Sequence, residues 1–161
     1  MTLFTVFLLA HVLGAIVAFG PTFAFPLIGG MGGKEPMHGN FAIRISYAIS
    51  HRITWPLALL QGLTGVGLIL TGNVDLTKAL WLDAGIVLYL IALGFSYFVQ
   101  TPRVVRIIAM TSTPPPPPAA GAAPSGPPPA LLALIKSVQQ GGMFMTALIV
   151  LIVTLMVTKP F

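Results

Sequence analysis

Four long apolar segments constrain the fold of this 161-residue chain more than any other feature of its sequence. Each is close to the ~20 residues that an α-helix needs to cross the hydrocarbon core of a bilayer. Lipid offers no hydrogen bonds to the backbone, so each segment has to pair its own N–H and C=O groups as a helix. We predict an all-α, integral membrane four-helix bundle, one domain over 1–161, with spans at about 2–26, 46–71, 79–100 and 131–157.

Composition supports a lipid bilayer as the surrounding solvent. Charged residues make up 7% of the chain and hydrophobic residues 56%, whereas a soluble domain has roughly 25% charged residues. The net charge of +5 comes from bases scattered singly, not from the basic stripe of a nucleic-acid-binding protein, so we expect no nucleic-acid partner. The absence of cysteine excludes disulfides, thiolate metal sites and iron–sulfur clusters. The first segment lacks a basic leader and is too long for a secretory signal, which favours a retained span.

Proline and glycine indicate where the segments end or bend. Pro21 and Pro26 mark the end of the first span or a kink near it. IGGMGGKEPMHG, at 28–39, reads as a Gly-rich turn, and NFAIRISYAISHR, at 40–52, reads as an interfacial helix or, as we prefer, a leading extension of the second span. Pro56 should free the backbone carbonyl four residues earlier and bend that span.

Residues 113–130 contain nine prolines and no charge. Proline forbids a regular helix there, so we predict a polyproline-II-like or disordered linker between the third and fourth spans. A docking motif for a proline-binding domain is the alternative.

The distribution of Lys and Arg predicts the orientation. Six of these residues fall on the side of the first and third loops and two on the other side. Cytoplasmic loops carry the excess of basic residues. We therefore expect a multi-pass protein of the cell membrane, the bacterial inner membrane, with both termini on the extracytoplasmic side.

His11 is the one ionisable side chain predicted deep inside a span, and such residues are functional hypotheses by default. Small residues follow it on its helix, and Gly62 and Gly65 lie on a comparable face of the second span. Small residues permit close helix packing. They also leave a slot for a flat macrocycle, and neutral imidazole is a usual axial ligand of b-type haem. Packing alone, and packing with a cofactor slot, both remain open.

A second cluster lies at the start of the second span, where Arg44, His51 and Arg52 share a region with aromatic residues. His51 lies near the cytoplasmic face and His11 about 10–15 Å deeper, so the two should not ligate one iron. His11 is left to pair with a methionine of the last span, Met143 or Met145, or His51 binds a separate group with Arg44 and Arg52 on its anionic parts. Alternatively, this cluster only anchors the helix at the interface.

Three phrases carry a family resemblance: HVLGAIVAFGPTFAFPLI, SHRITWPL and WLDAGIVLYLIALGF. They resemble a bacterial family of small predicted integral membrane proteins of unknown function. More distantly the chain is similar to the four-helix superfamily of the CopD copper-resistance membrane domain and the HemJ-type protoporphyrinogen oxidase. That resemblance implies haem or metal handling by an early-helix histidine, which His11 and, less closely, His51 match. The intramembrane lysine of a HemJ-like enzyme has no counterpart, since Lys78 and Lys136 lie at span ends.

The sequence thus favours a membrane protein that binds haem b or a similar redox cofactor. His11, His51 and Met145 are the candidate metal ligands, and Arg44, Arg52, Gly62 and Gly65 further candidate cofactor-binding residues. We expect it to serve as a subunit of a membrane electron-transfer assembly with other membrane subunits. A purely structural subunit and a copper or small-solute transporter are the alternatives. No catalytic triad, phosphate loop or zinc motif is present, so we expect no enzyme acting on its own.

Overall fold

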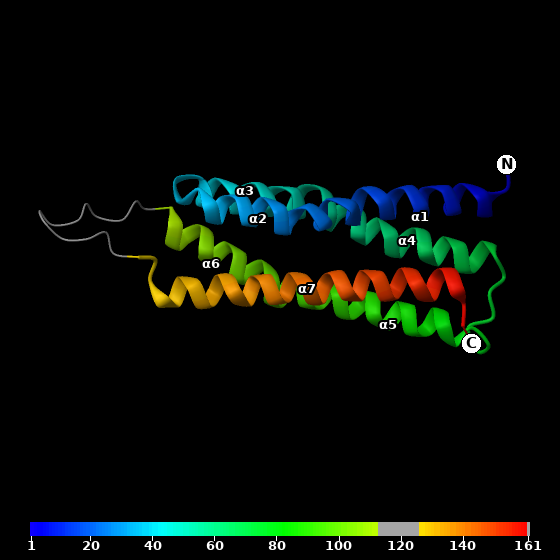
Figure 1. The fold of residues 1–161 in the computed structure, drawn as a ribbon. Helices are drawn as coiled ribbons and strands as arrows, with labels where there is room; N and C mark the ends of the chain where they lie inside the picture. The colour runs from blue at the N-terminus through cyan, green and yellow to red at the C-terminus, as the bar shows by residue number, and fades with distance from the viewer. Residues whose placement is uncertain (113–125, 161) are drawn as a thin grey trace, which may run out of the picture.

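The computed structural model describes residues 1–112 and 126–160 and is all-helical over them, which confirms the predicted four-helix membrane fold. Four long antiparallel segments lie side by side (Figure 1). In chain order the elements are α1 (Leu3–Phe19), η1 (Gly20–Ala24), α2 (Phe25–Lys34), η2 (Pro36–His38), α3 (Gly39–Ile49), η3 (Ser50–Thr54), α4 (Trp55–Thr71), α5 (Leu80–Phe95), η4 (Ser96–Gln100), α6 (Thr101–Thr111) and α7 (Pro129–Thr158).

The two termini lie at the same end of the bundle (Figure 1). α1 packs on α4 and α5 packs on α7 in the half that holds the termini, while α2 packs on α3, and α3 on α6, in the other half. An even number of crossings places both termini on one side of a membrane. That this side is extracytoplasmic stays a prediction.

The long segments exceed the predicted spans. They comprise 30 to 33 residues each, about 45–50 Å at 1.5 Å per residue, against ~30 Å of hydrocarbon. The predicted Gly-rich turn over 28–39 is wrong in its first half, because α2 continues to Lys34. At Gly32 a Cβ would lie 2.7 Å from the Cβ of Ala42, so this glycine lets α3 pack closely on α2.

Most of the predicted linker, residues 113–125, lies outside the described residues. α7 already begins at Pro129, with proline in the first helical turn, where its missing N–H costs no hydrogen bond. The last two residues of the predicted linker are therefore helical.

Three of the four segments change helical type in their middle. The first passes through the 3₁₀ turn η1, which contains Pro21. The second and third pass through π-helical turns, η3 and η4, each of which ends two residues before a proline, Pro56 and Pro102. Proline lacks an N–H and clashes with the carbonyl four residues earlier, so the hydrogen-bond ladder widens there. The predicted irregularity before Pro56 is thus present, and α7 runs uninterrupted.

The interior is built from small side chains. Within the described residues no large side chain is completely buried, and half of the buried hydrophobic residues are alanines, namely Ala18, Ala58, Ala79 and Ala92. Large apolar side chains cover the outer surface instead. Helices in lipid associate through small residues that let their backbones approach closely, which is the pattern seen here.

Candidate functional site

His11 is held between α1 and α4 by two hydrogen bonds. Its Nδ1 lies 2.9 Å from the Oγ1 of Thr64, and the Nε2 of Gln61 donates to its backbone oxygen over 2.7 Å. Gln61 and Thr64 keep 7% and 6% of their surface exposed, and they are the buried polar side chains of the described chain. The deep imidazole therefore has a fixed position, set by side chains one helical turn apart on α4.

The hydrogen bonds of Thr64 select the tautomer of His11. Oγ1 of Thr64 also lies 3.1 Å from the carbonyl oxygens of Leu60 and Gln61. When its hydroxyl donates to a carbonyl, Oγ1 accepts from Nδ1–H of His11, and Nε2 keeps a free lone pair. In the other tautomer the hydroxyl of Thr64 donates to Nδ1, and the ring proton lies on Nε2, where no described residue accepts it. Donors without a partner are rarer in proteins than acceptors without one, so the first tautomer is favoured. Nε2 is thus an available Lewis base.

Protein side chains occupy the glycine positions of the predicted slot. A Cβ at Gly62 would lie 2.7 Å from the hydroxyl of Tyr89, which donates to the carbonyl of Ala58 over 2.8 Å. A Cβ at Gly65 would lie 3.5 Å from Cε1 of His11. Tyr89 of α5 thus fills the space beside Gly62, and His11 of α1 fills the space beside Gly65, which favours close packing of α4 on both helices. The imidazole ring is half-buried, and Nε2 is not enclosed, so a group bound to His11 has to approach from this open edge.

His51 lies in η3, far along the bundle from His11. Its exposed ring stacks on Tyr47, with centroids 5.6 Å apart and planes 9° apart. His51 precedes Thr64, the partner of His11, by 13 residues, or about 20 Å along the helix. The structure keeps the two histidines apart, in agreement with the prediction that they do not ligate one iron. Arg44 and Arg52 are exposed on the same part of the chain, and their role as anion ligands stays a prediction.

Met145 is half-buried on α7, which packs on α5, α6 and η4. His11 lies where α1 packs on α4. A pairing of the two stays a prediction, as does transport of copper or a small solute. Within residues 1–112 and 126–160, no group of three or more His, Cys, Asp or Glu side chains could hold a metal ion.

The sequence did not reveal the role of Gln61 and Thr64. The structure places Gln61 beside His11, where its amide nitrogen donates to the backbone oxygen of that residue. A signal was present, because Ala58, Gln61, Thr64 and Gly67, the buried residues of α4, recur every three residues. This spacing defines one helix face. Two polar side chains on such a face, in a span, indicate hydrogen bonds to a neighbouring helix.

The two π turns carry the buried polar atoms that lack partners in the described chain. Oγ1 of Thr54 is the last side-chain oxygen of η3, and Oε1 of Gln100 ends η4. Gln100 uses its amide nitrogen to donate to the carbonyl of Val138 over 2.8 Å, and its head group fits against Gly141 of α7. Gly141 thus allows Gln100 to join α5–α6 to α7.

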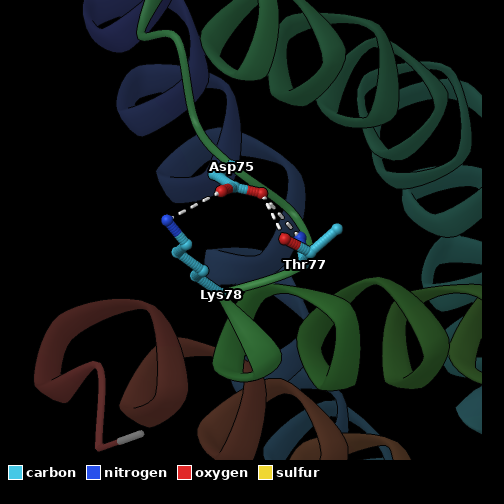
Figure 2. A network of polar contacts seen from close by, with 3 residues as sticks. All are labelled: Asp75, Thr77 and Lys78. Carbon is cyan, nitrogen blue, oxygen red and sulfur yellow. Dashed lines mark hydrogen bonds and ion pairs between the residues drawn. The ribbon is translucent and has the colours of Figure 1, made fainter.

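The turn between α4 and α5 is fixed by Asp75 (Figure 2). Its carboxylate accepts from the N–H and the hydroxyl of Thr77 at 3.0 and 2.6 Å and lies 3.5 Å from Nζ of Lys78. The hydroxyl and N–H of Thr77, more than Lys78, lower the pKa of Asp75 below its ordinary value. At the same end of the bundle, Nζ of Lys159 lies 5.3 Å from the ring centroid of Trp81, a cation–π contact.

No curated protein and no solved structure matches this chain. The profile of one family, described as predicted integral membrane protein (DUF2269), matches residues 5–160. This match agrees with the four apolar helices and with the predicted resemblance to a family of small membrane proteins. The chain therefore belongs to the DUF2269 family of predicted integral membrane proteins.

Proposed function

We propose that this protein is a membrane subunit that ligates a b-type haem, or a similar redox cofactor, through Nε2 of His11 at its contact with another membrane subunit. The observation that carries this proposal is the anchored imidazole: Nδ1 of His11 lies 2.9 Å from Oγ1 of Thr64, and no described residue forms a hydrogen bond with Nε2. Ligating histidines in proteins use the same arrangement, in which a second hydrogen bond fixes the ring and its tautomer.

The residues present fit one axial ligand. Gln61 holds the backbone of His11 in place and Thr64 orients the ring. Leu8, one helical turn before His11 on α1, and Val12, the next residue, are exposed and apolar. A bound haem supplies one-electron transfer, and its potential follows its axial ligands and the polarity around it. Because the face between α1 and α4 is filled, the opposite wall of the site comes from a partner.

Absorption spectra test this function. The full chain, solubilised with its native partners, is expected to show a Soret band. Reduction with dithionite should give a reduced-minus-oxidised difference spectrum. His11→Ala should abolish the band and Thr64→Val should weaken it, because the ring loses its anchor. His51→Ala serves as the matched control and should leave it intact. A colourless complex, or a band that persists in His11→Ala, would refute the assignment.

A structural subunit without a cofactor is the second candidate, favoured by the filled glycine positions and by the hydrogen bonds from Gln61 and Tyr89 to backbone carbonyls. Interhelical hydrogen bonds and small residues alone can join membrane helices. In that case His11→Ala leaves both the spectrum and the assembly unchanged, whereas Gly65→Leu, which forces the imidazole off α4, breaks the contact with the partner.

A further inference from the structure

The surface between α6 and α7 carries a groove made of two adjoining hollows of about 290 and 400 Å³. Ser137 lines both, so the hollows adjoin at this residue. Their other lining residues are Arg106, Met110, Ala130, Ala133 and Leu134 in the first, and Phe95, Arg103, Gln140, Gly141 and Phe144 in the second. The groove is thus apolar along its walls and carries one arginine in each hollow.

The charge of this groove is not neutralised within the described chain. Arg103 and Arg106 are separated by three residues on α6, so their side chains share a face. The ion pairs among residues 1–112 and 126–160 are Glu35–His38 and Asp75–Lys78, so neither guanidinium has a carboxylate partner. Arginine binds phosphate through paired N–H donors, and the hydroxyl of Ser137 is a further donor on the opposite wall.

The groove lies at the depth of a headgroup layer. Trp81 and Lys159 mark one end of the bundle. Arg103 follows Trp81 by 22 residues, and Ser137 precedes Lys159 by the same number, in both cases about 33 Å along a helix. The hydrocarbon core is about 30 Å thick. When the Trp81 end lies at one membrane–water interface, Arg103 and Ser137, on the two walls of the groove, therefore lie at the opposite interface.

We propose that this groove binds an anionic phospholipid, with the phosphate on Arg103 and Arg106 and an acyl chain along the aromatic pair Phe95 and Phe144. The rings of that pair lie 4.9 Å apart in an edge-to-face arrangement and bridge α5 and α7. Both lie on the side of the groove that faces the predicted membrane centre. The site does not depend on the function proposed for His11.

Lipid retention tests the proposal. The full chain in detergent is incubated with an equimolar mixture of phosphatidylglycerol and phosphatidylcholine, and bound lipid is counted by native mass spectrometry. The wild type should retain phosphatidylglycerol selectively, and R103Q/R106Q should retain at least about tenfold less, because two basic contacts at the surface are lost. R44Q/R52Q, which removes the same charge on the α3–η3 segment, is the matched control and should retain several-fold more phosphatidylglycerol than R103Q/R106Q.

Ala133→Trp provides a second variant for the case in which the arginine pair is needed for folding. Ala133 is exposed and lines the groove, so tryptophan should fill it, keep both arginines and still displace the lipid. Equal retention of the two lipids, or equal loss in the two arginine pairs, would overturn the site. Displacement of the lipid by millimolar inorganic phosphate alone would show a site for free phosphate in place of a phospholipid.

Discussion

At the scale of single residues, glycines in this bundle mark the places where side chains of neighbouring helices approach. Gly62 receives the hydroxyl of Tyr89, and Gly67 receives the ring of Phe7. By contrast, a Cβ at Gly94 or Gly142 would meet open space. The sequence predicted small-residue packing in general, but the identity of each partner depends on rotation and depth, which helical spacing alone does not determine.

Gly62→Ala should destabilise the protein by about 1–3 kcal/mol, as expected of an overpacked interior, because the new methyl group displaces the hydroxyl that donates to Ala58. Thermal unfolding in detergent micelles measures the change. Tyr89→Phe removes that hydroxyl and should partly rescue Gly62→Ala.

The control for this experiment is Gly94→Ala, whose new methyl group meets no neighbour. In a helix interior alanine is more favourable than glycine by about 1 kcal/mol. It should leave stability equal or raise it. Equal losses of stability in Gly62→Ala and Gly94→Ala would mean that Tyr89 does not lie where the new methyl group at position 62 has to go.

Asp75 makes the turn between α4 and α5 sensitive to acid. Because Thr77 and Lys78 favour its ionised form, its pKa in the folded protein lies below the ordinary 3.8. The stability that it contributes is therefore complete above that ordinary value and is lost as pH falls through the lower, folded value. A ¹³C titration of the carboxyl carbon should show this depression, and Thr77→Val should raise the pKa toward 3.8. An unchanged titration in Thr77→Val would contradict the role of that hydroxyl.

At the scale of elements, the π turns are the features that sequence reasoning anticipated least. Pro56 predicted a bend, and the widened ladder before it has the expected cause. Pro102 has the same effect before α6, although its segment reads as a span end in the sequence. A proline predicts the loss of one hydrogen bond. Whether the helix stops, kinks or widens depends on its neighbours, here α7 with Gly141 against Gln100.

Removing one residue from η4 should convert it to a regular α-helix and leave α6 with nearly the same rotation relative to α5, because the wider π turn accommodates one extra residue. Val99 is a suitable deletion. Arg106→Cys and Ser137→Cys, which line the same hollow, should react with a short bismaleimide in the parent and keep this cross-link after the deletion. Since the chain has no cysteine of its own, the product reports this pair alone.

A cysteine pair at Trp81 and Lys159, which are in contact at the other end of the bundle, is the control and should cross-link in both backgrounds. Loss of the cross-link between residues 106 and 137 after the deletion would show that η4 is not an α-helix widened by one residue.

At the scale of the whole molecule, the sequence predicted the number, type and order of the long helices, because twenty apolar residues in a row allow few alternatives. It also predicted a helical extension over 40–52, which agrees with α3. It did not predict the full length of the first and third segments, which α2 and α6 continue. Tertiary contacts stabilise α6, such as those of Asn40 on α3, which donates to the carbonyl of Ile108 and to Thr111.

Membrane-impermeant maleimide on intact cells tests the predicted orientation. Asn73→Cys, in the turn near the termini, should label from outside, whereas Ser112→Cys, at the opposite end, should label only after the cells are opened. Basic residues concentrate on the Ser112 side, which is why this side is expected in the cytoplasm. The reverse labelling pattern would invert the topology and place the α6–α7 groove in the outer leaflet.

The interruptions at η1, η3 and η4 fall about 25 Å from the terminal end of their segments, while α7 passes the same height as one continuous helix. The bundle thus combines one continuous helix, α7, with three helical segments whose interruptions lie in one plane across the bundle. We therefore expect any tilting of the α2–α3–α6 end to be concentrated in that plane. The α1–α4 pair, held together by the contact between His11 and Thr64, is expected to move as one unit on the other side of it.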